Sequence, residues 1–185
     1  MNSIYKKKRL FIFFLFFVFF NITYISNSYS QSSIAVLDVL TMLKDSNAAK
    51  SMKEQLDKTA KQYTEEEKKQ AKEIQKKEEE LLRQKKTLTP EAFSDRKNTF
   101  EKTVIEFNKK REAKRTALAK AKRESMRKIE DAVEKIVKEI QTAEKIDVVI
   151  KKTAVILSEG SIDITSKVIE KLNKEVSTID VNVTP

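Results

Sequence analysis

The side chains that could carry out chemistry in this 185-residue chain are almost all carboxylates, ammonium groups and guanidinium groups. The sequence contains no histidine and no cysteine, which excludes a Ser-His-Asp triad, a thiol nucleophile, a disulfide framework and the usual zinc sites. Gly160 is the single glycine, so the glycine-rich phosphate loops of nucleotide-binding proteins are excluded as well. The chemistry that remains is that of charge and of apolar contact.

Acidic residues occur in two short runs, Glu65–Glu67 and Glu78–Glu80. Both runs lie in strongly charged, helix-forming stretches that have no pocket-forming residues nearby. General acid–base catalysis needs a pair of such groups in a pocket where their pKa values diverge, so these runs are interpreted as solvated helix surface. We therefore predict that the protein is not an enzyme and binds no cofactor or metal.

Basic residues are concentrated between positions 109 and 128, a stretch that contains ten lysines and arginines and only two glutamates. One interpretation is a solvated helix surface. The other is a cationic wall that attracts acidic proteins or the phosphates of lipopolysaccharide or an anionic membrane. A nucleic-acid partner is not expected, because no stacking aromatic residues alternate with the charges. The candidate binding residues are Lys109, Lys110, Arg111, Lys114 and Arg115.

Three aromatic residues, Phe93, Phe100 and Phe107, follow each other at intervals of seven. On a straight helix this spacing drifts by only about 20° per step, so the three side chains share one face. They could form the seam of a helical hairpin against Ile74, Leu81 and Leu82. Alternatively, some of them are exposed and make weak, adaptable contacts with unfolded chains.

The first thirty residues predict a secretory signal peptide. Lys6–Arg9 form a basic segment, Leu10–Phe20 an apolar core of 11 residues, and Ser28–Ser30 a small-residue end. A membrane-spanning helix needs about 20 apolar residues, so an uncleaved anchor is the less favoured alternative. We predict cleavage near Ser30 and export to the periplasm. The remaining chain has 34 basic and 28 acidic residues, a formal charge of +6.

Long helices are predicted between residues 48 and 143, where 59 of 96 residues are Ala, Glu, Lys, Leu or Arg. Thr89, Pro90 and Glu91 have the order of a helix start: a capping hydroxyl, a proline at the first helical position and an acid near the positive end of the helix dipole. One helix is therefore expected to end near residue 86 and a second to begin at Pro90. Together they predict an antiparallel hairpin with its tip near 87–90.

A hairpin about Thr89 brings the segments on either side of it, 31–47 and 144–175, to the same level. These segments contain three candidate strands, 34–37, 146–150 and 153–157, and a short helix that Asp163 or Thr165 could cap. The fold class predicted is mainly α with a small β base. So small a base cannot cover its own strands, which favours symmetric self-association. Residues 176–185 are expected to be a frayed, flexible tail.

The strand 34–39, the Lys/Glu-rich helical middle and the closing block 145–172 together resemble the Skp/OmpH family of periplasmic chaperones. The resemblance implies a jellyfish-like homotrimer, in which three helical hairpins project as tentacles from a strand-mediated trimerisation body. It also implies ATP-independent holdase activity, in which unfolded outer-membrane proteins are held in the cavity between the arms. A lipopolysaccharide site in the region of Arg111, Lys114 and Arg115 is implied as well. The expected trimer-interface residues are Ile34, Val36, Val148, Ile150, Val155 and Leu157.

A structural coiled-coil scaffold of the cell envelope, without chaperone activity, is the alternative function. A scaffold needs an uninterrupted apolar seam, whereas a holdase needs arms that can separate. Charged residues such as Glu67 and Glu78 stand where a seam would require apolar groups. The pattern therefore favours the holdase.

Overall fold

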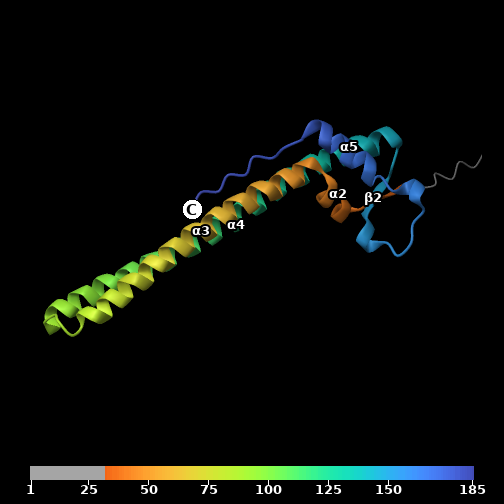
Figure 1. The fold of residues 1–185 in the computed structure, drawn as a ribbon. Coiled ribbons are helices and arrows are strands. Elements are labelled where there is room, and N and C mark those ends of the chain that lie inside the picture. The colour runs from red at the N-terminus through yellow and green to blue at the C-terminus, as the bar shows by residue number, and fades with distance from the viewer. Residues whose placement is uncertain (1–31) are drawn as a thin grey trace, which may run out of the picture. The chain divides into compact units, whose positions relative to one another are not determined.

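Helices make up most of the chain in the computed structural model, which describes residues 32–185 (Figure 1). The predicted signal peptide, residues 1–30, lies outside the described residues. The elements in chain order are β1 (Ile34–Leu37), α2 (Val39–Asp45), α3 (Asn47–Gln84), α4 (Pro90–Glu144), β2 (Val148–Lys151), the 3₁₀ turns η2 (Lys152–Ala154) and η3 (Gly160–Ile162), and α5 (Thr165–Glu175). The prediction of a mainly helical chain with a small β component is thus confirmed.

The antiparallel hairpin is formed by α3 and α4, which lie side by side in Figure 1. The predicted start of the second helix is confirmed: the Thr89 hydroxyl accepts a hydrogen bond from the Ala92 N–H, and Pro90 follows at the first helical position. At its other end, α4 stops at Lys145, which adopts the left-handed conformation with φ of 53°. The Ile146 N–H then bonds the Gln141 carbonyl, which satisfies one of the last carbonyls of the helix and redirects the chain into β2.

The sheet consists of two parallel strands, with Ile34 opposite Val148 and Leu37 opposite Lys151. Because parallel neighbours need a long crossover, the whole α2–α3–α4 segment serves as the connection between β1 and β2. On the other edge of β1, Val36 forms an isolated bridge with Asp163, and the Ile164 N–H bonds the Val36 carbonyl.

The prediction of a third strand at 153–157 is wrong, because the structure has no strand there. β2 ends at Lys151, and the chain enters the 3₁₀ turn Lys152–Ala154. The residues that follow have strong β propensity, but a strand also needs a neighbour to pair with, and Asp163 already occupies the outer edge of β1. Ile156 and Leu157 are fully or almost fully exposed as a result.

The apolar core lies where the hairpin meets the strands and α5. α4 contributes Ile129, Val133, Ile136 and Ile140, which are all buried and which follow one another at the intervals of four, three and four residues that are typical of a helical seam. α5 presents its apolar face to the same cluster through Val168 and Leu172, which have no exposed surface. The core therefore fixes the root of the hairpin to the small sheet.

The segment after α5 has a defined place, which differs from the frayed end that the sequence predicts. Ile179 is 6% exposed and belongs to the core cluster. Gln55 of α3 bonds the backbone of Ile179 and Val181, and Lys128 of α4 bonds the carbonyl of Asp180. Figure 1 shows this tail running back beside the hairpin.

Candidate functional site

The register of the hairpin determines which side chains of the two arms meet. Lys114 donates to Glu66 over 2.6 Å, and Arg96 donates to Gln84 nearer the tip. Each pair is symmetric about residue 90, as expected for two straight antiparallel helices joined by a short turn. The middle of the hairpin is therefore joined by polar contacts between side chains of the two arms.

Apolar packing between the arms is sparse away from the root. The buried residues of α3 are Ala48, Ala49, Met52 and Leu81, so no residue from 53 to 80 is buried. On α4 the first buried residue is Ala117. The outer half of the hairpin thus consists of two solvent-exposed helices, and few apolar contacts between them oppose their separation.

The three phenylalanines are half-buried, as is expected of residues that partly contribute to a seam. Phe100 lines a shallow hollow together with Leu81, and Phe107 lines the next hollow together with Ile74. Leu82, the third predicted partner, is 61% exposed and faces away from this seam. Phe100 and Phe107 thus offer part of each ring to the opposite arm and leave part accessible.

The five basic candidates divide into two groups. Lys109, Lys110, Arg111 and Arg115 are exposed. Lys114 differs, because its side chain is only 14% exposed, forms the ion pair with Glu66, and places its ammonium group 4.9 Å from the centre of the Tyr63 ring. Such a cation–π contact adds to the ion pair, so Lys114 joins the two arms and is not a free cation of the surface.

Arg111 and Arg115 border the same shallow hollow as Lys114, about 320 Å³ in volume, which lies between the arms. Tyr63 and Glu67 of α3 also line it. The hollow combines two guanidinium groups with one carboxylate and one aromatic ring. An anionic group could contact the guanidinium groups here, but Glu67 reduces the net positive charge of the hollow.

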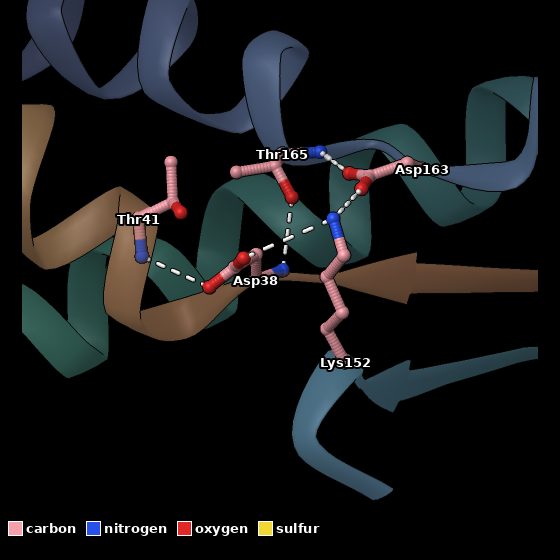
Figure 2. A network of polar contacts seen from close by, with 5 residues as sticks. All are labelled: Asp38, Thr41, Lys152, Asp163 and Thr165. Atoms are coloured by element: carbon pink, nitrogen blue, oxygen red, sulfur yellow. Dashed lines mark hydrogen bonds and ion pairs between the residues drawn. The ribbon is translucent and has the colours of Figure 1, made fainter. Parts of the chain in front are cut away.

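A polar network joins the ends of both strands to the start of α5 (Figure 2). Lys152 Nζ lies 2.9 Å from Asp163 Oδ2 and 3.8 Å from Asp38 Oδ2. Asp38 also caps α2 by accepting from the Thr41 N–H, and its own N–H donates to the Thr165 hydroxyl over 2.8 Å. The sequence identified Asp163 and Thr165 as candidate caps, whereas Lys152 was not recognised because its partners are 11 and 114 residues away.

The charges of this network stabilise one another. Hydrogen bonds from Thr165 and Lys152 lower the pKa of Asp163 from 3.8 to about 2. The Thr41 N–H, more than any other group, lowers the pKa of Asp38. The hydrogen bond to Asp163 raises the pKa of Lys152. All three groups are therefore charged at neutral pH, and the network is a structural clamp that positions the strands.

Several apolar side chains around the sheet are exposed. Of the predicted interface residues, Ile34 and Val148 are 44% and 46% exposed, and Leu157 is 91% exposed. Ile150 and Val155 are half-buried, while Val36 is buried within its own chain and presents no surface to a partner. Ile156 was not among the predicted residues, yet it is more exposed than any of them. Leu157 and Ile156 thus form the most accessible apolar pair of the base.

Neither a metal centre nor a membrane span emerges from residues 32–185. No group of three or more acidic residues in this range is arranged to hold a metal ion. Its helices are also too short or too polar to cross a bilayer.

Comparison with known proteins yields one family and one fold. The sequence model of the family described as Outer membrane protein (OmpH-like) matches residues 33–172. No curated protein matches the chain. Among solved structures, the fold is similar to that of a candidate outer membrane chaperone (OmpH-like) from Caulobacter crescentus CB15, with a TM-score of 0.78. The two sequences are 15% identical, and the match covers 84% of this chain and 92% of the other.

Proposed function

This chain belongs to the OmpH-like family, and from that premise we propose that it is an ATP-independent holdase chaperone of the periplasm. In this proposal it binds unfolded outer-membrane proteins and keeps them from aggregating. The description of the Caulobacter protein as a candidate outer membrane chaperone supports the same class of function.

The observation that carries this proposal is the hairpin whose outer half lacks a buried seam. A client without fixed structure is best bound by many weak contacts, because no single pocket can match it. The long stretch of α3 without buried residues, and the half-accessible Phe100 and Phe107 opposite it, provide such contacts. A scaffold would instead be expected to bury these rings in a continuous seam.

Assembly as a homotrimer is the second part of the proposal. Of the exposed apolar residues, Val148 lies in β2 of the two-stranded sheet that residues 32–185 form, and Ile156 and Leu157 follow that strand along the chain. Side chains of this size rarely cluster on the surface of a monomer without a partner to cover them. Three copies joined at this base would carry three hairpins around one cavity.

Electrostatic attraction is the third part. The run 109–128 carries ten basic and two acidic residues, and three copies would repeat this charge around the cavity. Such a field speeds the approach of acidic chains, and it could also attract lipopolysaccharide or an anionic membrane surface. Export through a signal peptide that is cleaved near Ser30 would place the protein where such partners occur.

The proposal is tested by dilution of a urea-unfolded outer-membrane β-barrel protein into buffer without nucleotide. Light scattering should rise in the control and stay low when the exported chain is present at a stoichiometric excess. A variant with Phe100→Ala and Phe107→Ala should protect less well, whereas Leu82→Ala at the exposed face of the tip should protect fully. Equal aggregation with and without the chain would contradict the holdase function and favour the envelope scaffold.

A further inference from the structure

The tail that follows α5 is bound to the hairpin as a segment without regular secondary structure. Residues 178–185 have no helical or strand partner of their own. Gln55 of α3 donates from Nε2 to the Ile179 carbonyl over 2.7 Å, and its Oε1 accepts from the Val181 N–H over 3.2 Å. Lys128 of α4 adds a bond to the Asp180 carbonyl over 3.2 Å. Both arms therefore contact the tail at one place.

In the tail, the Gln55 amide binds main-chain groups only. Its two partners lie on either side of residue 180, so the amide meets one carbonyl and one N–H, as a neighbouring β-strand would. Main-chain bonds of this kind supply affinity that does not depend on the sequence of the bound segment. The Ser51 hydroxyl accepts a further bond from the same Nε2 atom over 3.0 Å, which helps to orient the amide.

The side chains of the tail alternate in burial. Ile179 is buried, and Val181 and Val183 are half-buried, whereas Asp180, Asn182 and Thr184 are exposed. Ile179 belongs to the same core cluster as Met52 and Ile129, so one aliphatic side chain of the tail contributes to the core at the root of the hairpin. The tail thus buries an apolar side chain, fully or partly, at every second position from 179 to 183.

Transmembrane strands of outer-membrane barrels have this alternation over about ten residues, with apolar side chains toward the lipid and polar ones toward the interior. Residues 179–184 of the tail repeat the pattern, over six residues, at the root of the hairpin. The tail also lies beyond the residues that match the family, which end at 172. The family match therefore does not cover it.

We propose that the surface of the hairpin around Gln55 that the tail covers, here called the tail site, is a binding site for extended amphipathic strands of unfolded barrel proteins, and that the tail occupies it as an internal ligand. The identity of the competing client rests on the proposed function; the occupancy of the tail site by the tail does not. A client strand then replaces the tail by forming the same two main-chain bonds and by packing its own aliphatic residue in the place of Ile179. The tail lowers the affinity of the tail site for weakly matching segments.

The experiment uses the exported chain with Ile179→Asp, which removes the buried anchor of the tail and leaves the hairpin sequence unchanged. A fluorescent peptide with the sequence of residues 176–185 is titrated and followed by anisotropy. We expect saturable binding to Ile179→Asp and binding at least about fivefold weaker to the parent, because the apparent affinity scales with the fraction of molecules whose site is free. A peptide carrying Ile179→Asp and Val181→Asn is the negative control.

Gln55→Glu, added to Ile179→Asp, tests the site itself. The carboxylate is similar in size and can still accept from an N–H, but it cannot donate to the carbonyl, so peptide binding should fall several-fold. Gln75→Glu introduces the same charge about 30 Å further along α3 and should leave binding unchanged. Circular dichroism of each variant verifies that the helices are retained.

The same variants are then titrated with the urea-unfolded barrel. Tighter capture by Ile179→Asp than by the parent is the expected result. Failure of Ile179→Asp to bind the peptide, or equal capture of the barrel by both chains, would overturn the inference even where the parent suppresses aggregation. Peptide binding that depends on Gln55, without any capture of the barrel, would overturn the proposed function and support the strand-binding tail site alone.

Discussion

Lys152 Nζ lies 2.9 Å from Asp163 Oδ2, and this ion pair joins the end of β2 to the segment that begins α5. Thr165 donates its N–H to the other oxygen of the same carboxylate over 2.9 Å. The Asp163 side chain is 21% exposed, so solvent screens the pair only partly. Asp163 is therefore the group through which acid should act on the base of the protein.

The first prediction concerns acid stability. The folded chain lowers the pKa of Asp163 from 3.8 to about 2, so the folded state favours the charged carboxylate. The stability this provides is complete above about pH 4 and is lost as the pH falls through about 2. Asp163→Asn should lower the free energy of unfolding at neutral pH by about 1–2 kcal/mol and flatten its decline in acid. Urea unfolding followed by circular dichroism across this pH range measures both effects.

Asp131→Asn is the matched control for this experiment, since Asp131 is an exposed aspartate of α4. It should change the free energy of unfolding by no more than about 0.5 kcal/mol. If Asp163→Asn retains the full acid dependence of the parent, the ion pair does not contribute to stability.

The elements of the hairpin could be predicted from the sequence because their signals are local. Thr89 and Pro90 mark the start of α4 through the chemistry of a helix end, and the residues from Ile129 to Ile140 mark its buried face through their spacing. Each of these signals lies within one or a few helical turns. The structure confirms them to within one or two residues.

The features that the sequence did not reveal depend on contacts over long separations. Nothing in the sequence around Lys152 indicates its role, because its partners Asp38 and Asp163 come close to it only in the folded chain. Gln55 likewise shows nothing in sequence of its contact with a tail more than 120 residues away. In the segment 153–157 the sequence predicted a strand that the structure does not contain. This error arose because β propensity describes the preference of a residue and says nothing about whether a neighbouring strand is available for pairing.

The second prediction concerns the dynamics of the arms. Residues 62–80 of α3 include no buried side chain, so local opening there should cost little free energy. Amide hydrogen exchange should be fast in this stretch and in residues 109–116 of α4. It should be slow around the buried residues Ile129 and Ile136. Slow exchange along both arms would indicate a rigid coiled coil and favour a scaffold.

The third prediction concerns the exposed cations of α4. Glutamine at Lys109, Lys110, Arg111 and Arg115 removes four positive charges per chain without touching the Lys114–Glu66 pair. Association with an acidic unfolded client at low salt should slow by roughly tenfold, while dissociation changes little, because long-range attraction acts on the rate of encounter. Stopped-flow fluorescence measures both rates.

A control for total charge replaces four exposed lysines near the root, Lys44, Lys50, Lys138 and Lys151, with glutamine. It should slow association much less, since the Debye length is only about 8 Å in physiological salt and these positions lie far from the outer arms. Equal slowing by both variants would mean that net charge matters and the position of the cations does not.

The fourth prediction concerns assembly. Ile156 and Leu157 are exposed in the single chain, so Ile156→Asp together with Leu157→Asp should leave its fold and its helix content unchanged. In a trimer joined at the base the same changes would bury unpaired carboxylates, at a cost of several kcal/mol. Native mass spectrometry should therefore show a trimer for the parent and a monomer for the variant.

Leu82→Asp is the matched control for this experiment. Leu82 is exposed at the far end of the hairpin, so its replacement should leave the trimer intact. A variant at 156 and 157 that stays trimeric would exclude this face as the interface, and a monomeric parent would exclude the trimer itself.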